Sequence, residues 1–415
     1  MVAPVGVVVD AYTTGNLLPA AFDRHGVRLV HVQAAREISS ALPGPDIARF
    51  LDNIVFDGEL AVSRIGALRP LCVIAGQDSG VPLADLLNER LALPGNGSAL
   101  SIARGDKYRM IERLREHAVR CAQQFKSADP AELVRWAKEN QLDRVVVKPL
   151  SSAGTDRVYI CEGDAEIEAA ARAVLSGPDI YGKPNNEVLI QSFLEGAEYI
   201  VDTVSRDGRR FVCGVWRYHK RILADGRPVY DRDVLLAADE DPVPELIAYV
   251  DTVLDALGIR YGSGHAEVIM TADGPALVEI GARMNGNMNP GFHDRCLGHN
   301  QADLTALAYL RPERFLAEYA DRVYTRTAPA MVCNTTTDFD GVVESVDPAV
   351  VARIEELSSV YSLAVKLQPG NRIRPTKDLL TSPLRVFMTG GTEAEILADY
   401  ARLQEIKDDV YRVGD

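Results

Sequence analysis

The sequence predicts a protein of mixed α/β and α+β class, built from three lobes. Apolar strand-like runs alternate with amphipathic runs over the first 100 residues, which is typical of βα units around a parallel sheet. Longer strands joined as hairpins follow, and the tail returns to short alternating elements. We therefore expect a βα domain over 1–100, a central domain over 101–320 and a small α+β lobe over 321–415.

The first lobe has the pattern of a Rossmann-like arrangement. Strands are expected at Val5–Val9, Val27–Gln33 and Leu71–Ala75, and helices at Leu17–His25 and Pro82–Leu91. The turn-rich segment Leu93–Ser98 ends the lobe. No G-x-G-x-x-G follows the first strand, which argues against a nicotinamide enzyme.

The central part and the tail contain longer elements. Helices are expected at Asp106–His117, at Pro242–Leu257 with Gly258 as its stop, and at Thr392–Leu403. Central strands are expected at Arg144–Pro149, Arg157–Cys161, Glu187–Phe193, Tyr199–Val204, Phe211–Trp216, His265–Thr271 and Pro275–Ile280, and tail strands at Ala330–Thr335, Val360–Leu367 and Leu384–Thr389.

Composition narrows the classes of function. The chain of 415 residues carries a net charge of −14, which argues against broad nucleic-acid binding. Its six cysteines are scattered without a C-x-x-C pair, so a reduced, cytoplasmic setting is expected. The sequence shows neither a signal peptide nor a membrane span. Small molecules are the expected partners, and oligomerisation stays open.

A loop of small residues follows the β-branched run that ends at Lys148. Such a loop lets backbone N–H groups approach a polyphosphate, and its hydroxyls add donors. The loop residues of interest are Ser151, Ser152, Gly154 and Thr155. A plain hairpin with a solvated lysine is the alternative interpretation of the loop alone, and the segment is not a Walker A motif.

Two acids flank the turn Ala272–Gly274. Glu267 and Glu279 lie on the two strands of the expected hairpin, so antiparallel pairing sets them roughly opposite each other. Side-by-side carboxylates on buried strands need compensation, and Mg²⁺ supplies it because it takes one or two carboxylates plus phosphate oxygens. Two unrelated strand-end acids are the alternative.

Arg283 follows Glu279 and could face an oxyanion, although a surface salt bridge would explain it equally. Earlier in the chain, Glu198 could accept hydrogen bonds from ribose hydroxyls, but the residue considered alone is more simply interpreted as a surface acid. Lys220 belongs to a basic cluster that could meet phosphates. His265 shares a face with Glu267 and fits either a supporting or a packing role.

Taken in order, these motifs resemble the ATP-grasp ligases over about Asp106–Leu310. The resemblance assigns Lys107 and Lys148 to the nucleotide phosphates, with Ser152, Gly154 and Thr155 in the loop above them. It places Gln191, Ser192, Phe193 and Leu194 at the adenine and Glu198 at the ribose, with Lys220 also at the nucleotide. It makes Glu267 and Glu279 metal ligands, Arg283 catalytic, and Arg283, Gly286 and Asn287 substrate-binding.

Two positions depart from the family pattern. Gln191 stands where an acid is common, and Gly281 stands where many members carry a metal-binding Asn. Within the family, the segment after Glu279 is similar to bacterial L-amino-acid ligases of the bacilysin and dapdiamide type. That similarity implies dipeptide or antibiotic biosynthesis.

The resemblance implies an ATP-dependent ligase that joins a carboxylic acid to an amine, such as an L-amino acid, through an acyl phosphate. ADP and phosphate would be released. ATP and Mg²⁺ are the implied cofactors, with two ions expected and Mn²⁺ as an alternative. A carboxylase or nucleotide-pathway ligase of the same superfamily, and a non-catalytic nucleotide-binding scaffold, are the rival hypotheses.

Overall fold

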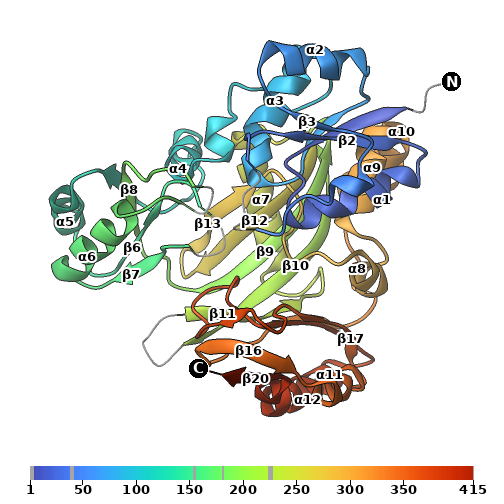
Figure 1. Cartoon of the computed structure of the whole chain (residues 1–415). Helices are drawn as coiled ribbons and strands as arrows, with labels where there is room; N and C mark the ends of the chain where they lie inside the picture. The colour runs from blue at the N-terminus through green and yellow to red at the C-terminus, as the bar shows by residue number, and fades with distance from the viewer. Residues whose placement is uncertain (1–3, 38–41, 153–155, 180–181, 223–227, 415) are drawn as a thin grey trace.

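The computed structural model describes residues 4–37, 42–152, 156–179, 182–222 and 228–414. Figure 1 shows the N-terminal lobe at the top, a small lobe at the left and the C-terminal lobe at the bottom, around a long central sheet. None of the helices in these ranges has the length and apolar character needed to cross a lipid bilayer.

The N-terminal lobe is a four-stranded parallel sheet in the order β3-β2-β1-β4. The fully buried, β-branched run of β1 explains why it takes a central place. The elements are β1 (Val5–Val9), α1 (Leu18–Asp23), β2 (Arg28–Gln33), β3 (Asn53–Val55), α2 (Glu59–Ala67), β4 (Val73–Ala75) and α3 (Val81–Arg90). The predicted elements are confirmed with shifted ends, whereas β3 and α2 were not predicted.

The small lobe carries a four-stranded antiparallel sheet in the order β5-β8-β6-β7. Helices α5 and α6 pack against each other, and their apolar residues form one hydrophobic cluster with those of this sheet. The elements are α4 (Lys107–Glu116), β5 (Gln124–Ser127), α5 (Pro130–Glu139), β6 (Val145–Pro149), β7 (Tyr159–Cys161), α6 (Asp164–Leu175) and β8 (Val188–Ser192).

The central sheet has nine strands, eight of them in the order β13-β12-β9-β10-β11-β15-β19-β17, with β14 paired to β10. Strands β9 and β10 are joined by a tight hairpin turn, in which Asp207 and Gly208 both have positive φ. The elements are β9 (Ala197–Arg206), β10 (Arg209–Ile222), β11 (Pro228–Leu235), α7 (Val243–Ala256), β12 (Gly262–Thr271), β13 (Gly274–Gly281), α8 (Pro290–Leu297), α9 (Gln301–Leu310), α10 (Pro312–Glu318) and β14 (Arg322–Val323).

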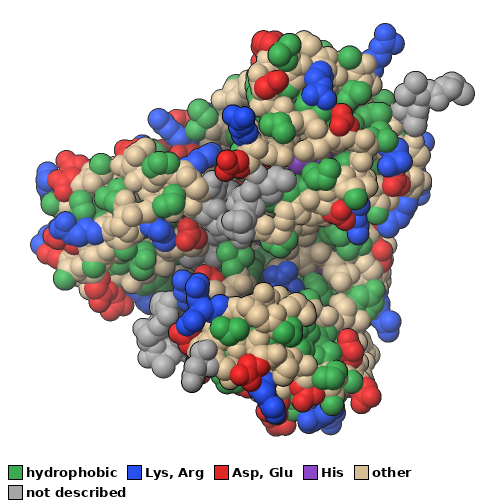
Figure 2. Space-filling view, in the orientation of Figure 1, with side chains coloured by type: hydrophobic (Ala, Val, Ile, Leu, Met, Phe, Trp, Pro, Cys, Tyr) green, Lys and Arg blue, Asp and Glu red, His purple; other side chains and the backbone are tan. Residues whose placement is uncertain are grey.

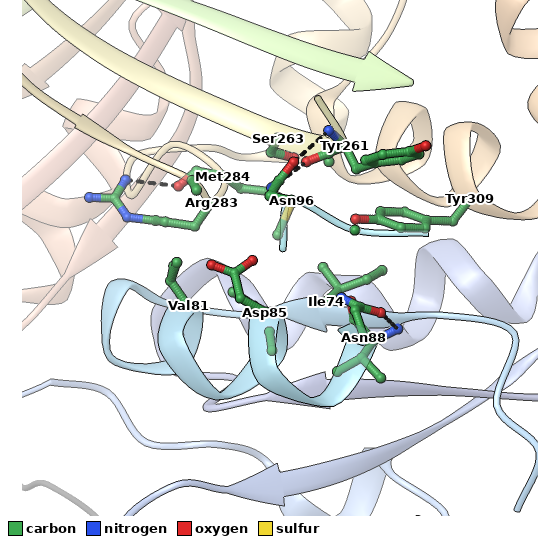
Figure 3. Close-up of a pocket in the computed structure, with 16 residues that line it drawn as sticks. Ile74, Val81, Asp85, Asn88, Asn96, Tyr261, Ser263, Arg283, Met284 and Tyr309 are labelled. Atoms are coloured by element: carbon green, nitrogen blue, oxygen red, sulfur yellow. Dashed lines mark hydrogen bonds between the residues drawn. The ribbon is translucent and has the colours of Figure 1, made fainter. Parts of the chain in front are cut away.

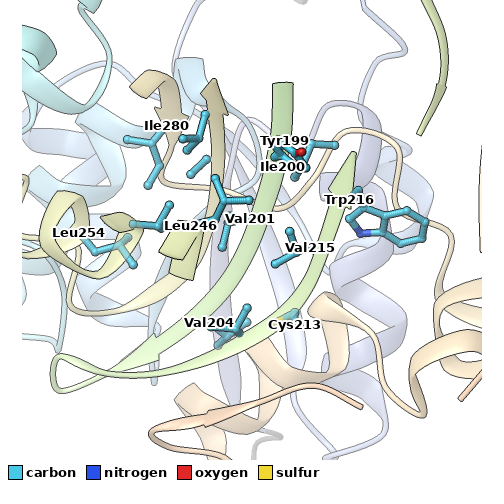
Figure 4. Packing of buried hydrophobic residues seen from close by; sticks show 14 of the residues in the cluster. Tyr199, Ile200, Val201, Val204, Cys213, Val215, Trp216, Leu246, Leu254 and Ile280 are labelled. Carbon is cyan, nitrogen blue, oxygen red and sulfur yellow. The ribbon is translucent and has the colours of Figure 1, made fainter. Parts of the chain in front are cut away.

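Helix α7 covers one face of this sheet. In Figure 4, Leu246 and Leu254 of α7 lie beside Val201 and Ile280 of the sheet, within the largest buried cluster of the protein. Burying a leucine side chain contributes roughly 1.5–3 kcal/mol. This packing holds one face of the sheet rigidly and leaves the other face for polar residues.

The C-terminal lobe continues the same sheet. Strand β15 pairs with β11, so the hydrogen bonding crosses the expected boundary at residue 320. The elements are β15 (Ala330–Asn334), β16 (Gly341–Val346), α11 (Pro348–Glu355), β17 (Val360–Val365), β18 (Arg372–Ile373), β19 (Leu384–Thr389), α12 (Glu393–Ile406) and β20 (Tyr411–Gly414). The division into three domains stays a prediction.

Candidate active site

The two predicted metal ligands face each other on β12 and β13. Near the turn the pairing is regular, with Val268 opposite Leu277, and it would set Glu267 opposite Val278. A bulge at this point adds one residue to β13, and Glu267 pairs with Glu279 instead. The two carboxylates therefore share one sheet face.

Two lysines approach this pair from the small lobe. Lys107, the first residue of α4, forms an ion pair with Glu279 and donates to the backbone oxygen of Ser152 at 3.1 Å. Burial alone would lower the pKa of Lys107, but Glu279 more than offsets it and the pKa is raised. The same pairing lowers the pKa of Glu279 against the effect of its own burial.

Lys148 lies in β6 and is 5 % exposed. Burial, together with the charge of Lys107, lowers its pKa to about 8. Among the residues that the structure describes, none forms a hydrogen bond or ion pair with its ammonium group. A buried cation without a partner is costly, so an anion is needed beside it.

The segment expected at the adenine begins at the end of β8. Gln191 is buried and donates to Gln124 Oε1 at 3.1 Å, and the N–H of Ser192 donates to the backbone oxygen of Gln123 at 2.9 Å. The ring of Phe193 lies under the guanidinium of Arg144, 4.0 Å from its centroid. The N–H and C=O groups of Leu194 make no backbone hydrogen bond to described residues, so both are open to a ligand.

Glu198, in β9, is held by two partners. Lys220 Nζ lies 2.5 Å from Glu198 Oε2, and the hydroxyl of Tyr230 donates to Glu198 Oε1 at 3.1 Å. Burial raises the pKa of Glu198 against the opposing effect of Lys220. The structure therefore places Lys220 beside the predicted ribose ligand.

Arg283 contacts the N-terminal lobe. Its Nε donates to Asp78 Oδ2 at 2.9 Å, and its Nη1 donates to the backbone oxygen of Met284. A Cβ at Gly281 would lie 2.7 Å from Asp78 Oδ1. The carboxylate of Asp78 thus occupies the space that a side chain at position 281 would need.

The turn after β13 is anchored by buried amides. Asn285 Nδ2 donates to Asp202 Oδ2 at 2.8 Å, and Asn287 Nδ2 donates to Asp233 Oδ2 at 3.1 Å. His265 Nδ1 lies 2.8 Å from Asp202 Oδ1, and its other ring nitrogen lies 3.7 Å from Glu267. His265 therefore lies between Asp202 and Glu267.

The remaining predicted site residues are Gly286, Ser152, Gly154 and Thr155. Gly286 is exposed at the tip of the turn, with open space where a Cβ would stand. The hydroxyl of Ser152 donates to Asp156 Oδ2 at 2.7 Å. The predictions for Gly154 and Thr155 fall outside the described residues.

Strand register extends the polar face beyond the predicted residues. Tyr218 of β10 pairs with Glu198 on one side and with Asp233 of β11 on the other, and its hydroxyl lies 3.4 Å from Glu267 Oε1. Figure 2 shows the molecule hollowed above the C-terminal lobe, with basic side chains visible inside the hollow. Sequence reasoning missed Tyr218, Asp233 and Asp78, since each becomes part of the site only through long-range pairing.

A small cavity lies behind Arg283, between α3 and the sheet. Figure 3 shows Asp85 and Asn88 of α3 on one side and Ser263 and Tyr309 on the other. Its volume of about 30 Å³ suits only about two water molecules. A cavity of this size is too small for a nucleotide or an amino acid.

Glu267 and Glu279 suit a Mg²⁺ ion by their chemistry. They are oxygen donors on one face, and Lys107 balances the charge of Glu279 in the structure. Within the described ranges, no group of three His, Cys, Asp or Glu residues is placed to hold a metal. Mg²⁺ needs only one or two carboxylates when phosphate oxygens complete its shell.

Comparison with known proteins agrees with this geometry. Residues 105–229 match the model of the phosphoribosylglycinamide synthetase ATP-grasp (A) domain. The chain is 34 % identical to dapdiamide A synthase of Enterobacter agglomerans, over 98 % of this chain and 97 % of that protein.

Two solved structures share the fold. The L-amino acid ligase from Bacillus licheniformis matches with a TM-score of 0.76 and 17 % identity, covering 99 % of this chain and 98 % of that one. The carboxyaminoimidazole ribonucleotide synthase from Aspergillus clavatus, complexed with ATP, matches with a TM-score of 0.71 and 14 % identity, covering 98 % and 99 %. At these identities the likeness shows the fold alone. The full-length relationship at 34 % identity goes further, and with it the chain belongs to the ATP-grasp family of ATP-dependent carboxylate–amine ligases.

Proposed function

We propose that the protein joins an amino acid or similar carboxylic acid to the amino group of an L-amino acid. The observation that carries the proposal is the facing pair Glu267 and Glu279, with Lys107 paired to one of them and Lys148 buried nearby. The full-length relative is named for the synthesis of dapdiamide A, and the solved ligase for L-amino acids.

The proposed reaction has two steps. An oxygen of the acid attacks the γ-phosphorus of ATP, and ADP leaves with the electrons of the broken P–O bond. The amine then attacks the carbonyl carbon of the acyl phosphate, and phosphate leaves as the amide forms. Phosphoryl transfer of this kind depends mainly on positioning and charge neutralisation.

The residues near the acid pair fit these needs. Lys148 offers a phosphate a buried cation that pairs with none of the described residues, and Lys107 can turn from Glu279 to a phosphate oxygen. Mg²⁺, which Glu267 and Glu279 would hold, supplies further positive charge beside the phosphates when it is bound. Two ions are proposed, as in the sequence-based expectation, and Mn²⁺ is the proposed substitute.

The remaining assignments concern binding. The open backbone of Leu194 suits the adenine edge, together with Gln191, Ser192 and Phe193 around it. Glu198, with Lys220 at its side, suits the ribose hydroxyls. Arg283 is proposed to stabilise the charge that develops on the acyl group, and Gly286 and Asn287 to border the substrate. Ser152, Gly154 and Thr155 are proposed to cover the phosphates.

The test is incubation with ATP, Mg²⁺ and paired panels of carboxylic acids and L-amino acids. Amide products should appear in the mass spectrum, with ADP and phosphate in equal amounts. AMP and pyrophosphate as products would contradict the acyl-phosphate route. Product formation with bicarbonate in place of the acid would favour a carboxylase instead.

A variant separates catalysis from simple nucleotide binding. Glu279→Gln should abolish ADP formation, since it removes one carboxylate of the pair, while circular dichroism and the unfolding midpoint stay close to wild type. ADP formation at the wild-type rate in this variant would rule out the metal assignment. Binding of ATP by the wild type without turnover of any panel member would indicate a scaffold.

A further inference from the structure

Arg385 and Asn334 form a pair on the C-terminal part of the central sheet. They lie directly opposite each other on β19 and β15. The Nε of Arg385 donates to Asn334 Oδ1 at 3.0 Å. No function has been assigned above to either residue.

The pair presents only hydrogen-bond donors. Because Oδ1 of Asn334 accepts from Arg385, the amide group of Asn334 must point its Nδ2 the other way. This Nδ2 is buried, and no described residue accepts from it. The terminal nitrogens of Arg385 likewise make no hydrogen bond to described residues. A buried donor without a partner costs about 1–3 kcal/mol, so an acceptor is expected here when the site is filled.

The surroundings favour an anion as that acceptor. Lys366 lies on the same sheet face as Arg385, diagonally across β17 and β19, because Ala364 pairs with Arg385. Its ammonium donates to the backbone oxygen of Leu379 at 3.3 Å. Burial, together with the charge of Arg385, lowers the pKa of Lys366 to about 7. A guanidinium, an amide donor and a nearby lysine form a setting that suits a carboxylate.

A lone acceptor lies beside this donor group. Asp233 of β11 pairs with Val332, which precedes Asn334 by two residues on the same face. Asp233 is 2 % exposed, and its Oδ2 accepts from Asn287. Its Oδ1 is buried and has no partner among the described residues. An acceptor and a set of donors thus lie on the same sheet face, on neighbouring strands.

The spacing suits a small zwitterion. Strands β11 and β19 lie two strand spacings apart, so the backbones at Asp233 and Arg385 are on the order of 10 Å apart. The long side chain of Arg385 shortens that gap. In an α-amino acid the nitrogen and the carboxyl carbon are only about 2.5 Å apart. Such a molecule can span from the acceptor to the donors.

The position also suits the second substrate. Tyr218 pairs with Asp233, and its hydroxyl lies near Glu267, two strands away. The polar face therefore curves so that side chains two strands apart meet. The subsite lies on the same face as the acid pair but away from the two lysines, where the phosphates of ATP are proposed to bind.

We infer that Arg385 and Asn334 bind the α-carboxylate of the amine substrate, and that Asp233 accepts a hydrogen bond from its amino group. The amine substrate is then a free α-amino acid. This inference rests on the proposed ligase function. It adds the residues that select the amine and the part of the substrate that they recognise.

The test compares three amines with the wild type and with Arg385→Gln, using the acid that the panels identify. Hydroxylamine is an amine that has no carboxylate, and it traps the acyl phosphate as a hydroxamate. An L-amino acid and its carboxamide differ only in the group that Arg385 binds. Arg372→Gln is the matched control, because Arg372 is an exposed arginine of the same lobe that pairs with Asp340.

In Arg385→Gln, the KM for the amino acid should rise roughly 10- to 100-fold, the usual effect of losing a charge-assisted hydrogen bond. Formation of the hydroxamate should stay within about twofold of wild type, which also shows that the variant is folded. The wild type should prefer the amino acid to its carboxamide, and the variant should lose that preference. Asp233→Asn should raise the KM for both the amino acid and its carboxamide.

An unchanged KM for the amino acid in Arg385→Gln would overturn the inference. A raised KM for the acid in the hydroxylamine reaction would also overturn it, since the subsite would then hold the first substrate. Failure of the wild type to form any hydroxamate or amide would instead reject the proposed function itself.

Discussion

Asp78 accepts a 2.9 Å hydrogen bond from Arg283, which ties the N-terminal lobe to the end of the strand that carries Glu279. The contact is possible because Gly281 has no side chain. A Cβ at this position would lie 2.7 Å from Asp78 Oδ1 and 3.1 Å from Arg283 Nε. The glycine that departs from the family pattern is therefore explained by packing. Asp78 of the N-terminal lobe thus holds Arg283 in place.

Gly281→Ala should displace the carboxylate of Asp78 and loosen Arg283. We expect kcat/KM to fall roughly 10-fold, as for the loss of one hydrogen bond between charged groups. Asp78→Ala should have a similar effect, and the double variant should be no worse than either one, because both remove the same contact. Gly105→Ala is the control, since a Cβ at Gly105 meets open space. Additive losses in the double variant would contradict this account.

The pH dependence of ATP use should report on Lys148. Burial lowers the pKa of Lys148 to about 8, so its ammonium is charged below that pH and loses its proton above it. Phosphate binding needs the charged form, and kcat/KM for ATP should therefore decline above about pH 8. In Lys148→Arg the guanidinium stays charged, so the decline should be absent up to pH 9.5. If kcat/KM for ATP declined equally above pH 8 in both enzymes, a group other than Lys148 would be responsible.

Ribose recognition by Glu198 can be tested with 2′-deoxyATP. The wild type should prefer ATP, while Glu198→Gln should raise the KM for ATP roughly 10-fold and reduce the preference. The comparison of nucleotides matters because Glu198 also holds Lys220 and Tyr230, so a KM effect alone could be structural. Glu195→Gln is an exposed control three residues earlier. A full preference for ATP in Glu198→Gln would exclude the ribose assignment.

Arg104 should be a main contributor to stability between the first two lobes. It is 2 % exposed, pairs with Asp85 at 2.7 Å and donates to the backbone oxygens of Asn96 and Leu257. Arg104→Met leaves Asp85 buried and unpaired, and should lower the free energy of unfolding by about 3–5 kcal/mol in urea titrations. The double variant with Asp85→Leu should regain part of that loss. A loss below about 1 kcal/mol in Arg104→Met would contradict the assignment.

The sequence was most informative about site residues whose positions depend on their spacing along one short segment of the chain. The hairpin between Glu267 and Glu279 could be predicted from two apolar runs and a turn, and its pairing is confirmed. The bulge that aligns the two acids could not, because it depends on which residues face α7. Leu277 and Ile280 both join the core although they are three positions apart, which a regular strand would not allow.

Other parts of the site depend on contacts that no local pattern reveals. Asp78 meets Arg283 across 205 positions of the chain. The charged run around Asp233 does not resemble a strand, yet β11 is central in the sheet. The amide of Gln191 is buried against Gln124, 67 positions earlier in the chain. In each case a residue distant in the sequence determines where the side chain points.

The unbroken pairing from β13 to β17 also constrains how the enzyme can be re-engineered. Since β11 and β15 are joined by backbone hydrogen bonds, the C-terminal lobe cannot be exchanged as a separate module. A chimaera that slips this register by a single residue would move Arg385 along the sheet by about 3.3 Å relative to Glu267 and turn its side chain to the opposite side. Grafts from relatives with other amine preferences should therefore keep the β11–β15 junction residue for residue and vary only the side chains that project above it.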